Sequence, residues 1–346
     1  MIRKVKPISF KLLLIIIISA SLFLLLELTM IILTDRKILS DYKPLIINYL
    51  AKKNSDNGDW RLFHIFQEEN YEVDEKLFWA PKKNSHFYNE DRFITRLSDR
   101  KEDNKRKITI ITYGDSNTQG NEKISWALEL GKELERKFDN IKVDILNAGV
   151  AGYSSYQGVN RLKDDLKKFR PQIIIFSFGW NDAAFAAGPV DKYYQLQNSL
   201  LENKLLNLHT YSVIKYHINK AGEKFQDERT KVNIPRVPSD EYQENLNLFI
   251  DIAADDGFYP VLLTRPFMNS DTLNRQFFDQ IQKNNEAVLK ISEHRSALAI
   301  DIRKEFGNNP GLFIDQSHFT NEGHKQAAKF IAGKLAEDRN ISKLFL

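Results

Sequence analysis

The chain has 346 residues, of which 42% are hydrophobic and 28% are charged, and its formal net charge at pH 7 is +4. The sequence contains no cysteine, which excludes disulfide bonds, thiolate catalysis and cysteine-ligated metal sites. Residues 1–33 contain four basic residues and one acidic residue and so carry +3 of the net charge of +4, and the composition gives no support for nucleic-acid binding.

The first predicted element is an apolar helix from Leu12 to Leu33 that contains one charged residue, Glu27. About 20 apolar residues suffice for a helix to cross a bilayer, although a carboxylate inside such a span is costly. Four basic residues precede this run: Arg3, Lys4, Lys6 and Lys11. The positive-inside rule then predicts a cytoplasmic N-terminus and an extracytoplasmic remainder. We expect residues 1–34 to form an uncleaved signal-anchor of a single-pass membrane protein; a cleaved signal peptide and a buried core helix are the alternatives.

Residues 35–106 are predicted to form a polar, aromatic-rich extracytoplasmic segment, and residues 107–346 a catalytic domain. From Lys107 onward, apolar β-branched runs alternate with amphipathic stretches. This alternation indicates an α/β fold with a parallel sheet of about five strands between two layers of helices. The strands are predicted at 108–113, 143–146, 173–178, 259–264 and 297–302. The helices are predicted at 125–138, 155–169, 242–256, 271–294 and 322–338.

An insertion at about 183–237 interrupts the alternation after the third predicted strand. It is predicted to be largely helical and to lack a strand. Lids and substrate-binding loops are common just past the carboxyl end of a strand, so this insertion is a candidate for shaping a substrate pocket.

The first strand is followed by a tight turn, Gly114-Asp115-Ser116, and then by a helical pattern. Open α/β sheets bind ligands at the carboxyl edge of their strands, which is where this turn places the serine. The same strand–turn–helix arrangement exposes nucleophilic serines in other hydrolases. Gly-Asp-Ser is also an ordinary turn sequence, so the prediction depends on partners for Ser116 elsewhere in the chain.

A nucleophilic serine needs a base, and the base needs an acid to orient it. Asp315 and His318 lie three residues apart just before the last predicted helix, a spacing that places both side chains on one face of a helical turn. The alternative is a turn capped by Asp315 with an exposed histidine. Two further loops follow strands and offer donors to an oxyanion: the glycine-containing loop 147–152 and the loop 179–182, which contains Asn181.

The ordered set Gly-Asp-Ser, glycine-rich turn, Gly-x-Asn-Asp and Asp-x-x-His resembles the SGNH, or GDSL-like, hydrolase family over about Lys107 to Leu335. The resemblance implies a three-layer α/β/α flavodoxin-like fold. It implies that Ser116 is the nucleophile, His318 the base and Asp315 the orienting acid. The implied oxyanion donors are the amides of Ser116 and Gly152 and the side chain of Asn181. It implies neither a cofactor nor a metal.

Two residues depart from the family pattern. Asn117 stands where the family's eponymous motif has leucine, and Tyr153 follows Gly152 where many relatives have a small polar residue. The second difference predicts a different substrate pocket. Asp115, Asp182 and His324 are expected to hold loops through hydrogen bonds to the backbone.

The predicted activity is therefore hydrolysis of an O-acyl ester, such as an O-acetyl ester, through an acyl-enzyme at the cell envelope. The ester is carried by a glycan or a lipid. One alternative is an O-acyltransferase that passes the acyl group to a glycan, and another is a catalytically silent glycan-binding protein. A metal-dependent phosphoesterase is disfavoured, because a two-metal site needs more histidine and carboxylate ligands than these loops provide.

Overall fold

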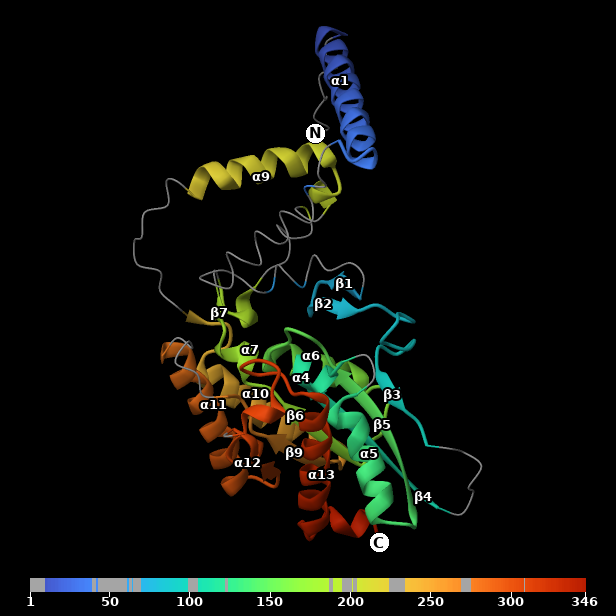
Figure 1. The fold of residues 1–346 in the computed structure, drawn as a ribbon, viewed down its shortest axis with the longest axis vertical. Helices are drawn as coiled ribbons and strands as arrows, with labels where there is room; N and C mark the ends of the chain where they lie inside the picture. The colour runs from blue at the N-terminus through green and yellow to red at the C-terminus, as the bar shows by residue number, and fades with distance from the viewer. Residues whose placement is uncertain are drawn as a thin grey trace, which may run out of the picture. The chain divides into compact units, whose positions relative to one another are not determined.

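The computed structural model describes residues 10–38, 42, 61, 64, 70–98, 105–121, 124–186, 189–194, 201, 204–223, 234–268, 275–307 and 309–346 (Figure 1). The chain divides into two compact units, which are described separately. The larger unit comprises residues 54–195 and 232–346, and the smaller unit comprises residues 1–53 and 196–231. The boundaries drawn from the sequence at residues 34, 106, 183 and 237 remain predictions.

A six-stranded sheet forms the centre of the larger unit, with the strand order β10-β9-β6-β4-β5-β3. Its strands are β3 (Ile94–Arg96), β4 (Arg106–Gly114), β5 (Ile141–Gly149), β6 (Ile173–Ser177), β9 (Tyr259–Leu263) and β10 (Leu298–Ile300). All neighbours are parallel except β3, which pairs antiparallel with β5. The five parallel strands have the doubly wound order of flavodoxin-like folds.

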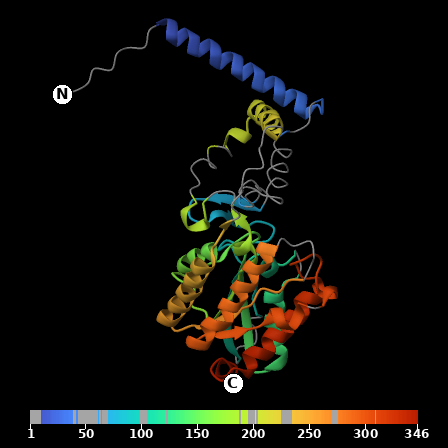
Figure 2. The ribbon, with the colours of Figure 1, turned by 90° about the vertical axis from the view of Figure 1, so that its left-hand side faces the viewer.

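Two layers of helices cover the faces of this sheet (Figures 1 and 2). On one face, α5 (Trp126–Lys137) packs beside α13 (Asn321–Glu337). On the other face lie α6 (Ser155–Asp165), α10 (Ser239–Asp256) and α11 (Arg275–His294). The short helices are α4 (Ser116–Gln119), α7 (Trp180–Ala183) and α12 (Ile302–Phe306), with 3-10 turns η1 (Asp191–Tyr193), η2 (Pro310–Leu312) and η3 (Ser342–Leu344).

The hydrophobic core explains why each helix lies where it does. Leu130 and Leu134 of α5 and Ile331 and Leu335 of α13 are fully buried against the sheet. These pairs recur every four residues, so each helix presents one apolar face. Ile173 to Phe176 of β6 are buried throughout, as expected for a parallel strand that is covered on both faces.

The register of the three central strands brings their carboxyl ends level. Gly114 at the end of β4 pairs with Gly149 at the end of β5 and with Ser177 at the end of β6. A Cβ atom on Gly149 would lie 2.2 Å from the backbone nitrogen of Gln119, so only glycine lets α4 pack against this strand end. The loops that follow β4, β5 and β6 therefore leave the sheet side by side. Because β4 lies between β5 and β6, this edge is also where the strand order reverses, the usual place for a ligand site in such sheets.

The predicted fold class and the five parallel strands are confirmed, and three features differ from the predictions. The prediction that the insertion lacks a strand is wrong, because β7 (Phe185–Ala186) and β8 (Ile234–Pro235) pair at its two ends. The strand β3 was not predicted, since three half-buried residues carry no clear alternation. Residues 71–81 also form a hairpin of β1 (Tyr71–Asp74) and β2 (Phe78–Pro81).

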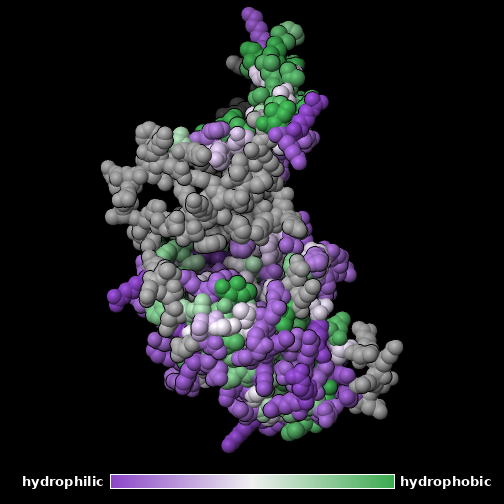
Figure 3. All heavy atoms as spheres, in the orientation of Figure 1, coloured by the Kyte–Doolittle hydropathy of each residue, from purple (hydrophilic) through white to green (hydrophobic). Residues whose placement is uncertain are grey.

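In the smaller unit, the described segments include the apolar helix α1 (Phe10–Asp35) and the helix α9 (His209–Glu223). The helix α1 is long and apolar enough to cross a membrane. Its leucine and isoleucine side chains are largely exposed, and Figure 3 shows that apolar residues make up much of the surface of this helix.

Candidate active site

Ser116 occupies the first position of α4, immediately after the turn that ends β4. Asp115 is the N-cap of this short helix: its carboxylate accepts the amide of Asn117 at 2.9 Å. The tight turn leaves Ser116 partly exposed at the carboxyl edge of the sheet, as the sequence predicted. The amide of Ser116 donates to no acceptor within the part of the chain that the structure describes.

His318 and Asp315 lie in the loop before α13, and this loop brings both to Ser116. The Ser116 hydroxyl lies 2.7 Å from Nε2 of His318, and Nδ1 of His318 lies 2.7 Å from Oδ2 of Asp315. Three side chains that are up to 202 residues apart in sequence thus form one hydrogen-bonded chain. Nδ1 of His318 is also 3.4 Å from the Ser317 hydroxyl.

The carboxylate of Asp315 is held in its ionised form by its own loop. Partial burial alone would raise its pKa, but hydrogen bonds from the amides of Ser317 and His318, both at 2.8 Å, and from the His318 ring lower the pKa below its ordinary value. An ionised carboxylate at Nδ1 fixes the imidazole tautomer whose Nε2 accepts a proton. The arrangement can therefore withdraw a proton from the Ser116 hydroxyl.

The two remaining predicted residues lie in the loops after β5 and β6. Gly152 has φ of +78°, and a Cβ atom there would lie 2.2 Å from Cδ2 of His64. Its amide makes no hydrogen bond to any described residue. The side-chain amide of Asn181 donates to the carbonyl of Tyr153 at 3.1 Å, which leaves its second N–H for another acceptor.

A buried ion-pair cluster from the ends of the insertion holds the Gly152 loop. Arg236 donates to the carbonyl of Gly152 at 2.7 Å and to Asp191 at 2.8 Å. Asp191 also accepts from the Ser154 hydroxyl at 2.6 Å and from Arg61 at 3.0 Å. Arg61, Arg236 and Asp191 are fully buried, so removing Asp191 would leave two buried positive charges without the carboxylate that they share. No short motif in the sequence indicated this cluster.

The sequence analysis also missed Arg265, which links the nucleophile loop to the base loop. This arginine follows β9 at the same sheet edge and is 1% exposed. Its Nε donates to Asp115 at 2.9 Å, and its NH1 donates to the carbonyl of Ser317 at 3.1 Å. The signal in the sequence was a charged residue directly after an apolar strand, in Thr264-Arg265-Pro266.

A second link between the two loops comes from Asn117. Its buried side-chain oxygen accepts the amide of Phe319 at 3.0 Å, so the residue after the serine is tied to the residue after the histidine. The departure from the family's leucine thus gives this chain a hydrogen bond that leucine cannot make.

The residues expected to hold loops do make hydrogen bonds to the backbone. Asp182 accepts the amides of Gly179 and Ser155, both at 2.9 Å, and burial raises its pKa to about 6. His324 accepts the amide of Trp126 at 3.1 Å, and burial lowers its pKa to about 4, so it is neutral at physiological pH. Neither belongs to the chain of side chains around Ser116.

Tyr153 faces away from solvent. It is 1% exposed, and its hydroxyl donates to the carbonyl of Trp79 in β2 at 2.7 Å. The ring of Trp79 stacks on His64, with centroids 5.0 Å apart. Burial, and then the nearby charge of Arg236, lowers the pKa of His64 to about 3. Tyr153 therefore joins the Gly152 loop to the β1–β2 hairpin.

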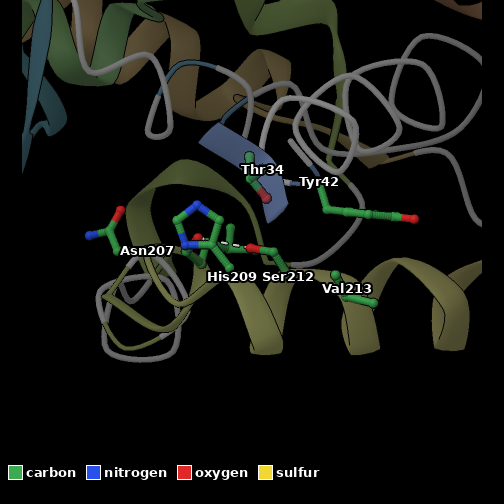
Figure 4. A pocket seen from close by; sticks show the side chains of 7 residues that line it. Thr34, Tyr42, Asn207, His209, Ser212 and Val213 are labelled. Atoms are coloured by element: carbon green, nitrogen blue, oxygen red, sulfur yellow. Dashed lines mark hydrogen bonds between the residues drawn. The ribbon is translucent and has the colours of Figure 1, made fainter. Parts of the chain in front are cut away.

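A cavity of about 110 Å³ lies in the smaller unit (Figure 4). It is lined by Thr34, Tyr42, Leu206, Asn207, His209, Ser212 and Val213. No residue of the candidate active site is among them, so this cavity is not its substrate pocket.

The flavodoxin-like sheet order and the Ser116–His318–Asp315 chain at its carboxyl edge have the geometry of a serine hydrolase. The model of the GDSL-like lipase/acylhydrolase family matches residues 112–326, more than half of the chain. The chain belongs to this family.

The chain is similar to the uncharacterized lipoprotein YqeF of Bacillus subtilis (strain 168), with 25% identity over 161 residues. The match covers 45% of this chain and 47% of YqeF, so the chain spans about half the length of this curated relative. It is similar in fold to the lipase/acylhydrolase from Enterococcus faecalis (17% identity, 66% of this chain and 95% of that chain, TM-score 0.42). It is also similar to Axe2, an acetylxylan esterase from Geobacillus stearothermophilus (13% identity, 68% and 97%, TM-score 0.46).

Proposed function

We propose that the chain is an ester hydrolase that works through an acyl-enzyme formed on Ser116. The observation that carries the proposal is the pair of 2.7 Å contacts that join the Ser116 hydroxyl to His318 and His318 to Asp315. His318 takes the hydroxyl proton while Oγ attacks the ester carbonyl carbon. The proton then passes to the leaving alcohol, and His318 activates the water that releases the acid.

The proposed oxyanion donors are the amides of Ser116 and Gly152 and the side chain of Asn181. An oxyanion hole needs donors that are fixed before the charge develops. The hydrogen bonds from Asn181 to Tyr153 and from Arg236 to the Gly152 carbonyl support this role, because they hold two of the donors in place.

We place the reaction at the cell envelope, on an O-acyl ester of a glycan or a lipid. The support is the apolar helix α1, which in this proposal anchors the chain with its N-terminus in the cytoplasm and the catalytic unit outside. O-acetyl glycans are the first natural substrates to test.

The test is acid release by the full chain in detergent from p-nitrophenyl esters of increasing acyl length. We expect turnover that is lost in Ser116→Ala and kept in Ser292→Ala. Among the described residues, the Ser292 hydroxyl bonds to the carbonyl of Leu289 within α11 alone, so this variant controls for loss of a serine. Turnover that survives in Ser116→Ala, or that chelators abolish, would contradict the acyl-enzyme proposal.

The same acyl-enzyme can pass its acyl group to a sugar hydroxyl. The assay therefore includes a soluble oligosaccharide and measures both free acid and acylated sugar by mass spectrometry. We expect free acid as the main product. Acylated sugar as the main product would replace the hydrolase with an acyltransferase and leave the role of Ser116 unchanged.

A further inference from the structure

Glu27 is a carboxylate within an otherwise apolar helix, and the smaller unit gives it a specific partner. Its two oxygens accept the first two amides of α9, from His209 at 2.5 Å and from Thr210 at 2.8 Å. Oε1 also lies 3.3 Å from Nδ1 of His209. The first amides of a helix lack partners within it and carry partial positive charge, so a carboxylate there is stabilising. Glu27 thus caps a helix that begins 182 residues later in the chain.

The helix α9 has an exposed apolar stripe, made of Ile214, Ile218 and Ala221. The spacing of four and three residues places them on one helical face. The isoleucine side chains are 52% and 62% exposed. The opposite side is occupied within this unit: Ser212 is buried, and its hydroxyl donates to the carbonyl of Leu206 at 2.8 Å (Figure 4). The apolar stripe therefore points away from the side of α9 that the chain itself covers.

The position of Glu27 along α1 shows which surroundings suit this stripe. Glu27 lies eight residues before Asp35, the last residue of α1, which is about 12 Å along a helix. In a bilayer, the interfacial region on each side of the hydrocarbon core is about 5–8 Å deep, and an interfacial helix buries its apolar face about 5–10 Å into the boundary of headgroups and acyl chains, so a point about 12 Å below the outer end of α1 lies close to that boundary. Leu22, Leu24 and Leu28, on either side of Glu27, are more than half exposed and need an apolar solvent. A helix docked at Glu27 therefore meets the boundary between lipid and water.

We infer that α9 is an interfacial helix that lies on the outer leaflet where α1 leaves the bilayer, with Ile214 and Ile218 in the lipid. An amphipathic helix with an apolar stripe is stable in that position. Glu27 fixes its first turn against α1. The inference rests on the proposed role of α1 as a membrane anchor. It gives the insertion a second role, because the chain then meets the membrane through the anchor and again through α9.

Because the sequence has no cysteine, a single introduced cysteine gives one labelling site. The full chain is reconstituted in phosphatidylcholine–phosphatidylglycerol vesicles and labelled with a fluorophore at Ile214→Cys or Ile218→Cys. Leu22→Cys is the reference for lipid, and Asp255→Cys, on an exposed position of α10, is the reference for water. Nitroxide lipids report contact with acyl chains, and iodide reports access from water.

We expect the two α9 labels to be quenched by nitroxide lipids several-fold more than the Asp255 label and to be protected from iodide. If iodide reaches the α9 labels freely while nitroxide lipids still quench the Leu22 label, the inference about α9 is wrong and the proposal that α1 is an anchor is unaffected. Protection from iodide without quenching by lipid would also overturn it, because protein, such as a second copy of the chain, would then cover the stripe. An unquenched Leu22 label would remove the anchor and the inference together. Ester hydrolysis by the same vesicles reports separately on the chemistry.

The capping role of Glu27 has its own variant. Glu27→Leu should reduce the lipid quenching of the Ile214 label, because the first turn of α9 loses its partner on α1. Thr29→Ala is the matched control, since the Thr29 hydroxyl donates to the Leu25 carbonyl of its own helix and bonds to no other residue in the described ranges. Equal quenching in Glu27→Leu and Thr29→Ala would overturn the capping role.

Discussion

Replacing Asn117 with leucine tests how the nucleophile loop and the base loop are held together. Leucine has the same number and branching of side-chain heavy atoms as asparagine and restores the residue of the family's eponymous motif. It removes the acceptor that lies 3.0 Å from the amide of Phe319. That amide is buried, so water cannot readily replace the lost acceptor.

The expected cost follows from the unpaired donor. A buried N–H left without a partner costs about 1–3 kcal/mol of unfolding free energy. For a domain of this size, about 2 kcal/mol corresponds to a Tm that is lower by about 4–8 °C. The same change loosens the 2.7 Å contact between Ser116 and His318, and misplacement of reacting groups by about 1 Å can slow a reaction by about 100-fold. We expect kcat to fall by at least about tenfold with KM little changed, because only the reacting geometry is affected.

The measurements are thermal unfolding and ester hydrolysis by the full chain. Asn309→Leu is the matched control: the Asn309 oxygen accepts the amide of Gly311 at an exposed site, where water can replace it. The free energy of unfolding of this control should fall by less than about 1 kcal/mol, and its kcat should equal that of the parent chain. If Asn117→Leu keeps both the Tm and the kcat of the parent chain, the coupling of the two loops through Asn117 is wrong.

Three further predictions follow from the site. Asn181→Ala should lower kcat by about 100-fold or more without changing the Tm, and an unchanged kcat would remove Asn181 from the oxyanion hole. Gly152 has a φ of +78° and Gly257 a φ of +74°, so alanine is strained at both positions. A Cβ atom at residue 152 would also lie 2.2 Å from the ring of His64, whereas a Cβ atom at residue 257 would have no atom within 4 Å. Gly257→Ala should therefore cost about 1 kcal/mol and keep its activity, whereas Gly152→Ala should cost more and lose kcat; equal losses would contradict the contact with His64. Burial lowers the pKa of His324 from its ordinary value of 6.5 to about 4 in the folded chain. Between these two pH values the unfolded chain therefore binds more protons than the folded chain, and the free energy of unfolding falls as the pH falls. Urea unfolding at pH 7 and pH 5 measures how much unfolding free energy is lost between these pH values. We expect this loss to be about 2 kcal/mol smaller in His324→Asn than in the parent chain, and an identical loss would show that His324 is not buried in its neutral form.

The sequence predicts the central sheet well because the parallel strands are rich in apolar, β-branched residues and are followed by glycine, proline or charged residues. The buried stretch from Ile173 to Phe176 is an example. The loops that follow β4, β5 and β6 were predictable for a related reason: each follows an apolar strand, and the register of these strands brings their carboxyl ends to one edge. Gly114, Gly149 and Ser177 pair level with one another, so their following loops must meet.

What could not be predicted depends on contacts between distant segments. In the sequence, Arg265 is an arginine before a proline with no motif around it. Only the folded chain shows that its side chain donates hydrogen bonds to both Asp115 and the carbonyl of Ser317. The buried pair of Arg236 and Asp191 likewise joins the two ends of the insertion, and neither residue lies in a recognisable motif. Short edge elements such as β3 and β7 have too few residues to show a period.

The most direct test of the account is covalent labelling of the serine. The full chain in detergent is treated with an organophosphorus ester, such as diisopropyl fluorophosphate, while ester hydrolysis and the intact mass are followed together. We predict one adduct per chain, located by peptide mass analysis on Ser116, which appears in proportion to the loss of activity and is absent in Ser116→Ala and in His318→Ala. Loss of activity with the adduct on another residue, or hydrolysis that continues after Ser116 is fully modified, would contradict the proposed nucleophile.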